Sequence, residues 1–229
     1  MKKNALVDNM LPPLVCMSML VALAAALLYA PTEKVMGDTQ RIFYFHVPAA
    51  ISAFVCFFLV FLGSVQYLRT RYAHWDRLAL CAAELGVLFG LIVLVTGPLW
   101  AKPIWGVYWR WEPRLTSMLI AFSIYVAYLM VRTQGGSGGQ TPRLAAVLGV
   151  VAFINVPLVY YSVDLWAADQ QLHPQRNVDL QPEMRYALWV CFAAFFLLLA
   201  LLLKRRIELA KIEEAVEKMR QRIAAGMDY

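Results

Sequence analysis

Charged residues are scarce in this sequence. Only 16% of its 229 residues are Asp, Glu, Lys or Arg, whereas 61% are hydrophobic, and the mean hydropathy is +0.59. A soluble domain needs more polar surface than this composition supplies. The composition therefore excludes a single soluble domain and predicts a membrane protein.

Cysteine and histidine are also few, with four and three copies. All four cysteines fall within apolar runs, which argues against a disulfide framework or a paired redox motif. They are Cys16, Cys56, Cys81 and Cys191. The sequence has no Cys-x-x-Cys-His motif and no Walker-type glycine-rich motif. We therefore expect neither covalently attached haem nor an ATP site.

Apolar runs long enough to cross a bilayer occur six times. A transmembrane helix needs about 17 to 25 predominantly apolar residues. The predicted spans are residues 14–30, 48–68, 79–97, 115–131, 144–162 and 186–203. The first lacks the short apolar core and cleavage site of a removed signal peptide, so we interpret it as a retained span. The predicted fold is an all-α integral membrane protein with six transmembrane helices.

The basic residues predict the orientation of these helices. With the N-terminus in the cytoplasm, most of the 21 lysines and arginines fall on the cytoplasmic side, as the positive-inside rule requires. Both termini are therefore predicted to be cytoplasmic. Residues 1–203 are predicted to form the membrane domain and residues 204–229 a cytoplasmic amphipathic helical tail. We favour a solvated continuation of the last span for this tail over a docking stripe for a cytoplasmic partner.

Aromatic and polar residues gather in the three loops that this topology places on the outer face. The loops are residues 31–47, 98–114 and 163–185. The first contains His46, the third contains His173, and the remaining histidine, His74, falls in a cytoplasmic loop. The second contains an aromatic run at residues 105–114. Two histidines that flank such a run could supply both axial ligands of a haem iron.

The aromatic run is predicted to form a short interfacial element that turns into the fourth span, with Pro113 in its first turn. Its platform candidates, four of them at helical spacing, are Trp105, Tyr108, Trp109, Trp111 and Glu112. An aromatic membrane belt needs no ligand and remains an alternative for the aromatic residues alone. The second loop carries three cations on the side that the positive-inside rule disfavours, and the carboxylates of a large planar ligand, such as haem propionates, would account for them. These propionate candidates are Lys102, Arg110 and Arg114.

Two polar positions fall inside the predicted spans. Glu84 is an intramembrane acid, for which a structural and a functional role are both open. Asn155 and Pro157 predict a kink in the fifth span that serves helix packing.

Three segments together resemble a known family. Residues 105–117 resemble the tryptophan-rich signature of haem-handling membrane proteins in cytochrome c maturation, and their Arg-Leu-Thr-Ser ending is most similar to the CcmC family. Residues 42–50, around His46, and residues 155–173, up to His173, agree with the same family. With the six spans, the resemblance covers nearly the whole chain. Glu112 stands where the family usually has Asp, and residues 167–171 make the third segment slightly longer.

The resemblance implies a function. The protein would bind haem b transiently at the outer, periplasmic face of the cell inner membrane, with His46 and His173 near the iron and the aromatic run as its platform. It would present this haem to a CcmE-like periplasmic chaperone. Its other implied partners are CcmA/CcmB-like ABC components and a CcmD-like small membrane protein. By the same resemblance, the chain delivers haem and is not an enzyme.

Three alternatives remain beside this interpretation. A component of the two-protein cytochrome c synthesis route shares the tryptophan signature, but its large protein has more spans and more histidines. A b-type cytochrome would have histidine ligands inside helices, whereas no histidine lies in a predicted span. A small-solute transporter or channel with an aromatic interfacial anchor would bind no haem.

Overall fold

The structure is a computed structural model that describes residues 2–134, 140–165 and 180–225 of the chain. Every regular element in these ranges is a helix, and one isolated β-bridge joins Glu33 to Gly37. The elements are α1 (Lys2–Ala24), η1 (Ala25–Tyr29), η2 (Asp38–Ile42), α2 (Phe43–Thr70), α3 (Ala73–Trp105), α4 (Pro113–Gln134), α5 (Gln140–Ala152), α6 (Asn155–Leu165) and α7 (Pro182–Ala224). Here η1 is a π-helical end of α1, and η2 is a short 3-10 helix.

Six helical segments are long and apolar enough to cross a membrane. α1 with η1, η2 with α2, α3, α4 and α7 provide one each, and α5 and α6 together provide the fifth along the chain. The predicted all-α fold with six spans is thus confirmed.

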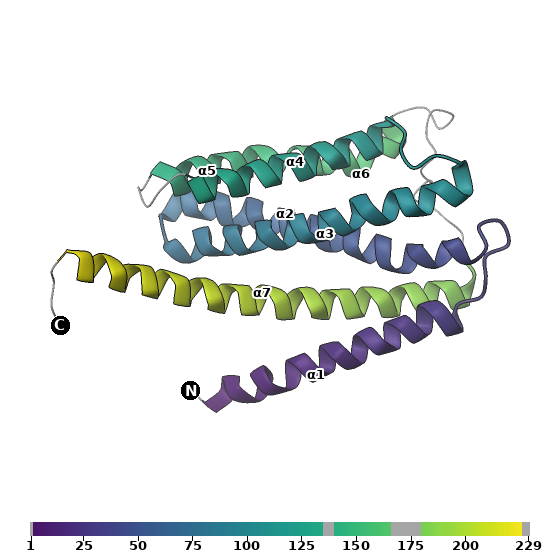
Figure 1. Cartoon of the computed structure of the whole chain (residues 1–229), viewed down its shortest axis with the longest axis horizontal. Coiled ribbons are helices and arrows are strands. Elements are labelled where there is room, and N and C mark those ends of the chain that lie inside the picture. Colours follow the sequence, from purple (N-terminus) through teal and green to yellow (C-terminus); the bar gives the residue numbers. More distant parts are fainter. Residues whose placement is uncertain (1, 135–139, 166–179, 226–229) are drawn as a thin grey trace.

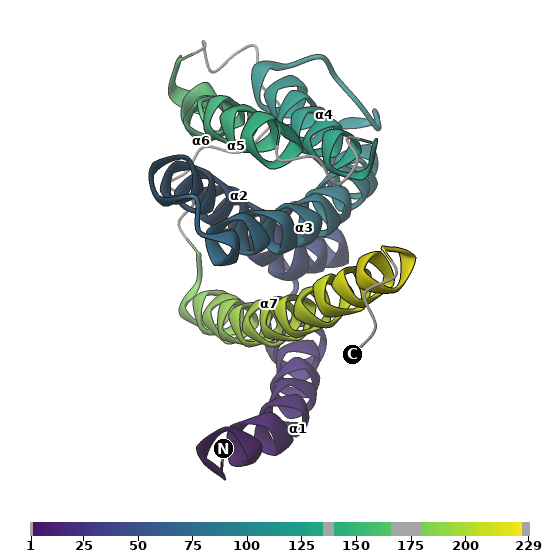
Figure 2. The same ribbon diagram turned by 90° about the vertical axis from the view of Figure 1, so that its left-hand side faces the viewer.

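The helices stack in layers (Figures 1 and 2). The antiparallel pair α2 and α3 lies in the middle, α4, α5 and α6 cover one side of it, and α7 covers the other. α1 packs outermost, mainly against α7. With 43 residues, α7 is about 65 Å long, roughly twice the thickness of a bilayer's hydrocarbon core.

Aromatic stacking and small residues hold the central layers together. The rings of Phe57 on α2 and Tyr125 on α4 stack with their centroids 3.8 Å apart. Gly86 on α3 makes room for this pair, because a Cβ there would lie 2.6 Å from Cε1 of Phe57. Such small residues let membrane helices approach closely.

The fifth span is broken where the sequence predicted a kink. α5 ends at Ala152, and α6 begins at Asn155. Pro157 has no N–H to donate to the carbonyl of Phe153, which instead accepts the N–H of Val156 at 3.0 Å. The Asn155 side chain donates from Nδ2 to the Ser117 carbonyl on α4 at 2.8 Å, so the polar residue serves helix packing.

Ion pairs join the helices at the end of the bundle where α3 begins and α4 ends. Glu84 on α3 pairs with Arg206 on α7, with 2.9 Å between Oε1 and Nη2. Arg77, also on α3, pairs with Glu214 on α7. These contacts give Glu84 a structural role: its carboxylate helps to hold the long helix α7 against α3.

Candidate functional site

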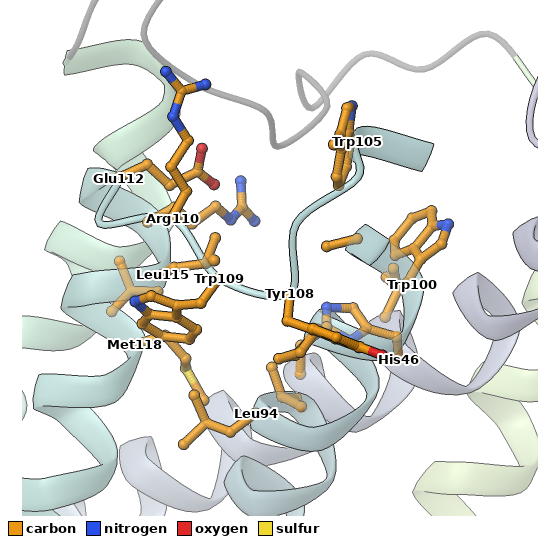
Figure 3. A pocket seen from close by; sticks show the side chains of 18 of the residues that line it. His46, Leu94, Trp100, Trp105, Tyr108, Trp109, Arg110, Glu112, Leu115 and Met118 are labelled. Atoms are coloured by element: carbon orange, nitrogen blue, oxygen red, sulfur yellow. The ribbon is translucent and has the colours of Figure 1, made fainter. Parts of the chain in front are cut away.

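A hollow lies at the opposite end of the bundle, where α2 begins, α3 ends and α4 begins (Figure 3). Its volume is about 1060 Å³, including the part that is open to solvent. Apolar side chains of α2, α3, α4 and α6 form most of its wall, and the segment between α3 and α4 crosses its mouth. This segment is the aromatic run.

The aromatic run has well-defined ends. α3 continues to Trp105 and stops at Gly106, whose φ of +76° is accessible to glycine and unfavourable for other residues. The Gly106 N–H donates to the Lys102 carbonyl at 3.0 Å, a common way of closing a helix. Residues 107–112 are not helical, although four platform candidates have helical spacing. Pro113 then begins α4, as predicted.

The aromatic side chains of the run divide between the hollow and its surroundings. Trp105, Tyr108 and Trp109 line the hollow. Trp111 does not line it and is 75% exposed, although its ring contacts that of Trp109 edge-on with centroids 5.6 Å apart. The platform candidates therefore do not form one continuous surface.

His46 lies in the first turn of α2 and not in a loop, which corrects the sequence interpretation. The helix begins at Phe43, five residues before Pro48, where the predicted span began. The side chain is buried, at 8% exposed, and lines the hollow. Its Nδ1 lies 2.8 Å from Oγ1 of Thr96 on α3.

The other two histidines differ in position. His74 lies in the first turn of α3, at the far end of the bundle, with its ring stacked on Tyr72. His173 lies outside the residues that the structure describes. The structure thus places one candidate ligand, His46, beside the aromatic run.

Trp100 was missed in the sequence interpretation and belongs to the site. It lines the hollow and is 7% exposed, and its ring meets that of His46 edge-on with centroids 5.8 Å apart. Figure 3 shows His46 and Trp100 on one side of the hollow and Trp109 on the other, with Tyr108 between them. One signal was available: Trp100 falls in the same predicted outer loop, residues 98–114, as the aromatic run.

The polar candidates occupy the mouth of the hollow. Arg110, Glu112 and Arg114 all line it. Glu112 is 3% exposed, Arg114 is half-buried and Arg110 is exposed. Lys102 does not line the hollow: its Nζ donates to the Gly106 carbonyl at 2.7 Å and lies 5.2 Å from the centre of the Tyr108 ring.

A model of the CcmC family, described as heme exporter protein C, matches residues 2–222. The chain belongs to the heme exporter protein C family. It is 34% identical over 202 residues to heme exporter protein C of Paracoccus denitrificans, with 85% of this chain and 80% of that protein covered. It is also 33% identical over 183 residues to heme exporter protein C of Escherichia coli, covering 77% and 73%.

The family extends beyond bacteria. A putative cytochrome c biosynthesis ccmC-like mitochondrial protein of Marchantia polymorpha is 34% identical over 180 residues, which cover 78% of this chain and 76% of that protein. Membership of the heme exporter protein C family implies a role in haem handling for cytochrome c biogenesis. With its six apolar helices, the chain is a multi-pass membrane protein.

The groups that line the hollow of this heme exporter C family member have chemistry that suits haem. The indole N–H of Trp109 is buried and has no hydrogen-bond partner among the described residues. Imidazole, aromatic faces and guanidinium groups match the iron, the ring and the propionates of haem.

Proposed function

We propose that this protein binds haem b transiently in the hollow and presents it to a CcmE-like haem chaperone during c-type cytochrome biogenesis. One observation carries the proposal: a buried histidine of α2 lies in the wall of an aromatic hollow whose mouth carries arginines. An apolar planar ligand with an iron centre and two carboxylates uses all of these groups. A small solute would not need them.

The residues of the hollow have distinct roles in this proposal. His46 provides a nitrogen ligand to the iron, and His173 provides the second. The faces of Tyr108 and Trp109 bind the porphyrin ring. Arg110 and Arg114 bind the propionates.

The exposed parts of the aromatic run suit transfer to a partner. Tyr108, which lines the hollow, is 57% exposed, and Trp111, whose ring contacts that of Trp109, is 75% exposed, so a second protein can reach the edge of a ligand in the hollow. In this proposal the hollow faces the periplasm, both termini face the cytoplasm, and the protein lies in the inner membrane. CcmA/CcmB-like ABC components and a CcmD-like protein are its further partners, and the chain itself makes and breaks no covalent bond.

The helical position of His46 bears on the b-type cytochrome alternative, which requires histidines within helices. Such a protein holds its haem between facing histidines, and His74, the other helical histidine among the described residues, lies at the far end of α3. His46 itself is in the first turn of its helix, near the mouth of the bundle. This arrangement supports haem held at one end of the bundle over haem held in its middle.

The test is an optical spectrum of the purified protein loaded with haem. His46→Ala and His173→Ala are each expected to lose most of the Soret absorbance or to shift it, whereas His74→Ala is expected to match the wild type. Transfer to a CcmE-like chaperone is measured in parallel as haem covalently attached to that partner. A wild-type protein that remains colourless with haem supplied, or ligand variants with normal spectra and normal transfer, would overturn the proposal and leave the transporter alternative.

A further inference from the structure

Thr96 makes two short contacts that connect α2 to α3 beside the hollow. Its Oγ1 lies 2.7 Å from the carbonyl oxygen of Ile92, one turn earlier in α3. The same Oγ1 lies 2.8 Å from Nδ1 of His46 on α2. One hydroxyl group therefore lies between a backbone carbonyl and the proposed haem ligand.

The two distances determine where the protons are. Two oxygens at 2.7 Å repel each other unless a proton lies between them, and a carbonyl has none to give. The single hydroxyl proton of Thr96 therefore points to Ile92, and Oγ1 can only accept from His46. It follows that Nδ1 of His46 carries the hydrogen. In a neutral imidazole the other nitrogen, Nε2, then has the free lone pair.

The surroundings of His46 leave Nε2 for the hollow. The ring lies along α3, since a Cβ on Gly97 would be 3.5 Å from Cε1 of His46 and the Trp100 ring meets it edge-on. Within residues 2–134, 140–165 and 180–225, Nε2 has no hydrogen-bond partner. With its Nδ1 edge held on α3, the ring offers its remaining nitrogen to whatever occupies the hollow (Figure 3).

We propose that Thr96 is a positioning residue, which fixes the Nδ1–H tautomer and the orientation of His46 so that Nε2 is presented as an iron ligand. The ligand role rests on the proposed function, whereas the tautomer does not. Hydrogen bonds of this kind commonly orient metal-binding histidines and increase the basicity of the ligating nitrogen. No haem needs to be present for the hydroxyl to have this effect.

The first experiment reads the tautomer without haem, by ¹⁵N NMR of histidine-labelled protein at about pH 8, where an ordinary imidazole is neutral. The His46 signals are identified by their loss in His46→Ala. The wild type and Thr96→Ser are expected to show Nδ1–H, and Thr96→Val is expected to shift toward Nε2–H. Thr70→Val is the matched control, because Thr70 makes the same bond to a carbonyl one turn earlier, at 2.7 Å, without a histidine.

The second experiment measures haem affinity and the Soret and iron–histidine vibrational bands of the same variants. Thr96→Val is expected to bind haem about tenfold more weakly, the lower end of the 10–100-fold effect usual for such supporting residues. Thr96→Ser and Thr70→Val are expected to match the wild type. A wild-type His46 that carries Nε2–H, or a Thr96→Val protein with unchanged tautomer and affinity, would overturn the inference. A tautomer shift in Thr96→Val together with no haem binding by the wild type or by any variant would support the tautomer assignment and overturn the proposed function.

Discussion

The charged residues at the two ends of the helix bundle have different interaction partners. At the tail end, where α3 begins, α4 ends and α7 extends, the charges pair with one another across helices. These pairs are Arg132–Asp76, Arg77–Glu214 and Arg206–Glu84. At the hollow end, Arg110 is exposed and has no ion pair within the described residues, and Lys102 contacts a carbonyl and a ring. The charges named at the tail end are therefore paired within the protein, whereas Arg110 at the hollow end is accessible to a group from outside the chain.

Breaking a pair at the tail end has the largest expected effect on stability. Arg132 and Asp76 have side chains that are only 12% and 18% exposed, and their second contact, from Nη2 to Oδ2, is 2.8 Å. Asp76→Ala leaves the guanidinium buried without its partner, which destabilises a protein by about 3–5 kcal/mol. A large fall in melting temperature in detergent is expected, and Asp76→Glu serves as the control that keeps the charge. An unchanged melting temperature would show that the tail end is not held by this pair.

A second difference between the ends is how tightly their helices pack. A Cβ on Gly63 would lie 2.8 Å from the Trp75 carbonyl at the tail end, whereas a Cβ on Gly97 would meet His46 at 3.5 Å, an ordinary contact. Gly63→Ala is therefore expected to cost about 1–3 kcal/mol. Gly97→Ala is expected to leave stability unchanged or raise it, since alanine favours a helix by about 1 kcal/mol over glycine. Equal melting temperatures for the two variants would contradict this comparison.

At the hollow end, removing an aromatic face is expected to weaken haem binding with little effect on stability. Trp109→Leu keeps an apolar side chain and removes the flat ring, and such ring contacts contribute about 0.5–1.5 kcal/mol beyond burial, or a roughly 2- to 13-fold weaker affinity. The change in haem affinity is measured by titrating haem and following the Soret band. The control is Trp189→Leu on α7, where the tryptophan is 64% exposed and does not line the hollow. Equal losses in both variants would remove Trp109 from the platform.

The smallest expected effect is that of a single exposed cation. Arg110→Gln removes one charge at the mouth of the hollow, where an exposed ion pair contributes at most about 1 kcal/mol, or about fivefold in haem affinity. The loss should shrink as salt is raised, because salt screens exposed charges. Arg205→Gln, an exposed cation at the tail end, should bind haem normally at every salt concentration. A salt-independent loss would mean that Arg110 acts through packing and not through charge.

The helix ends that frame the site could be predicted from local sequence features, whereas the positions of His46 and Trp100 could not. Gly106 and Pro113 mark where α3 ends and α4 begins, since positive φ and a missing N–H are properties of single residues. The position of His46 was predicted incorrectly, because hydropathy locates the apolar part of a helix and not its first turn. Trp100 was missed for a related reason: nothing local distinguishes a tryptophan that faces a hollow from one that faces lipid.

By itself, the sequence determined the six spans and the presence of an aromatic and cationic segment between two of them, because run length and composition are local properties of the chain. Only the tertiary structure decided which of these residues meet. The contact between His46 and Thr96 joins positions 50 residues apart, and it depends on how α2 and α3 are aligned along each other. That alignment comes from the packing of small and aromatic side chains over the whole length of the two helices, and no short sequence segment contains it.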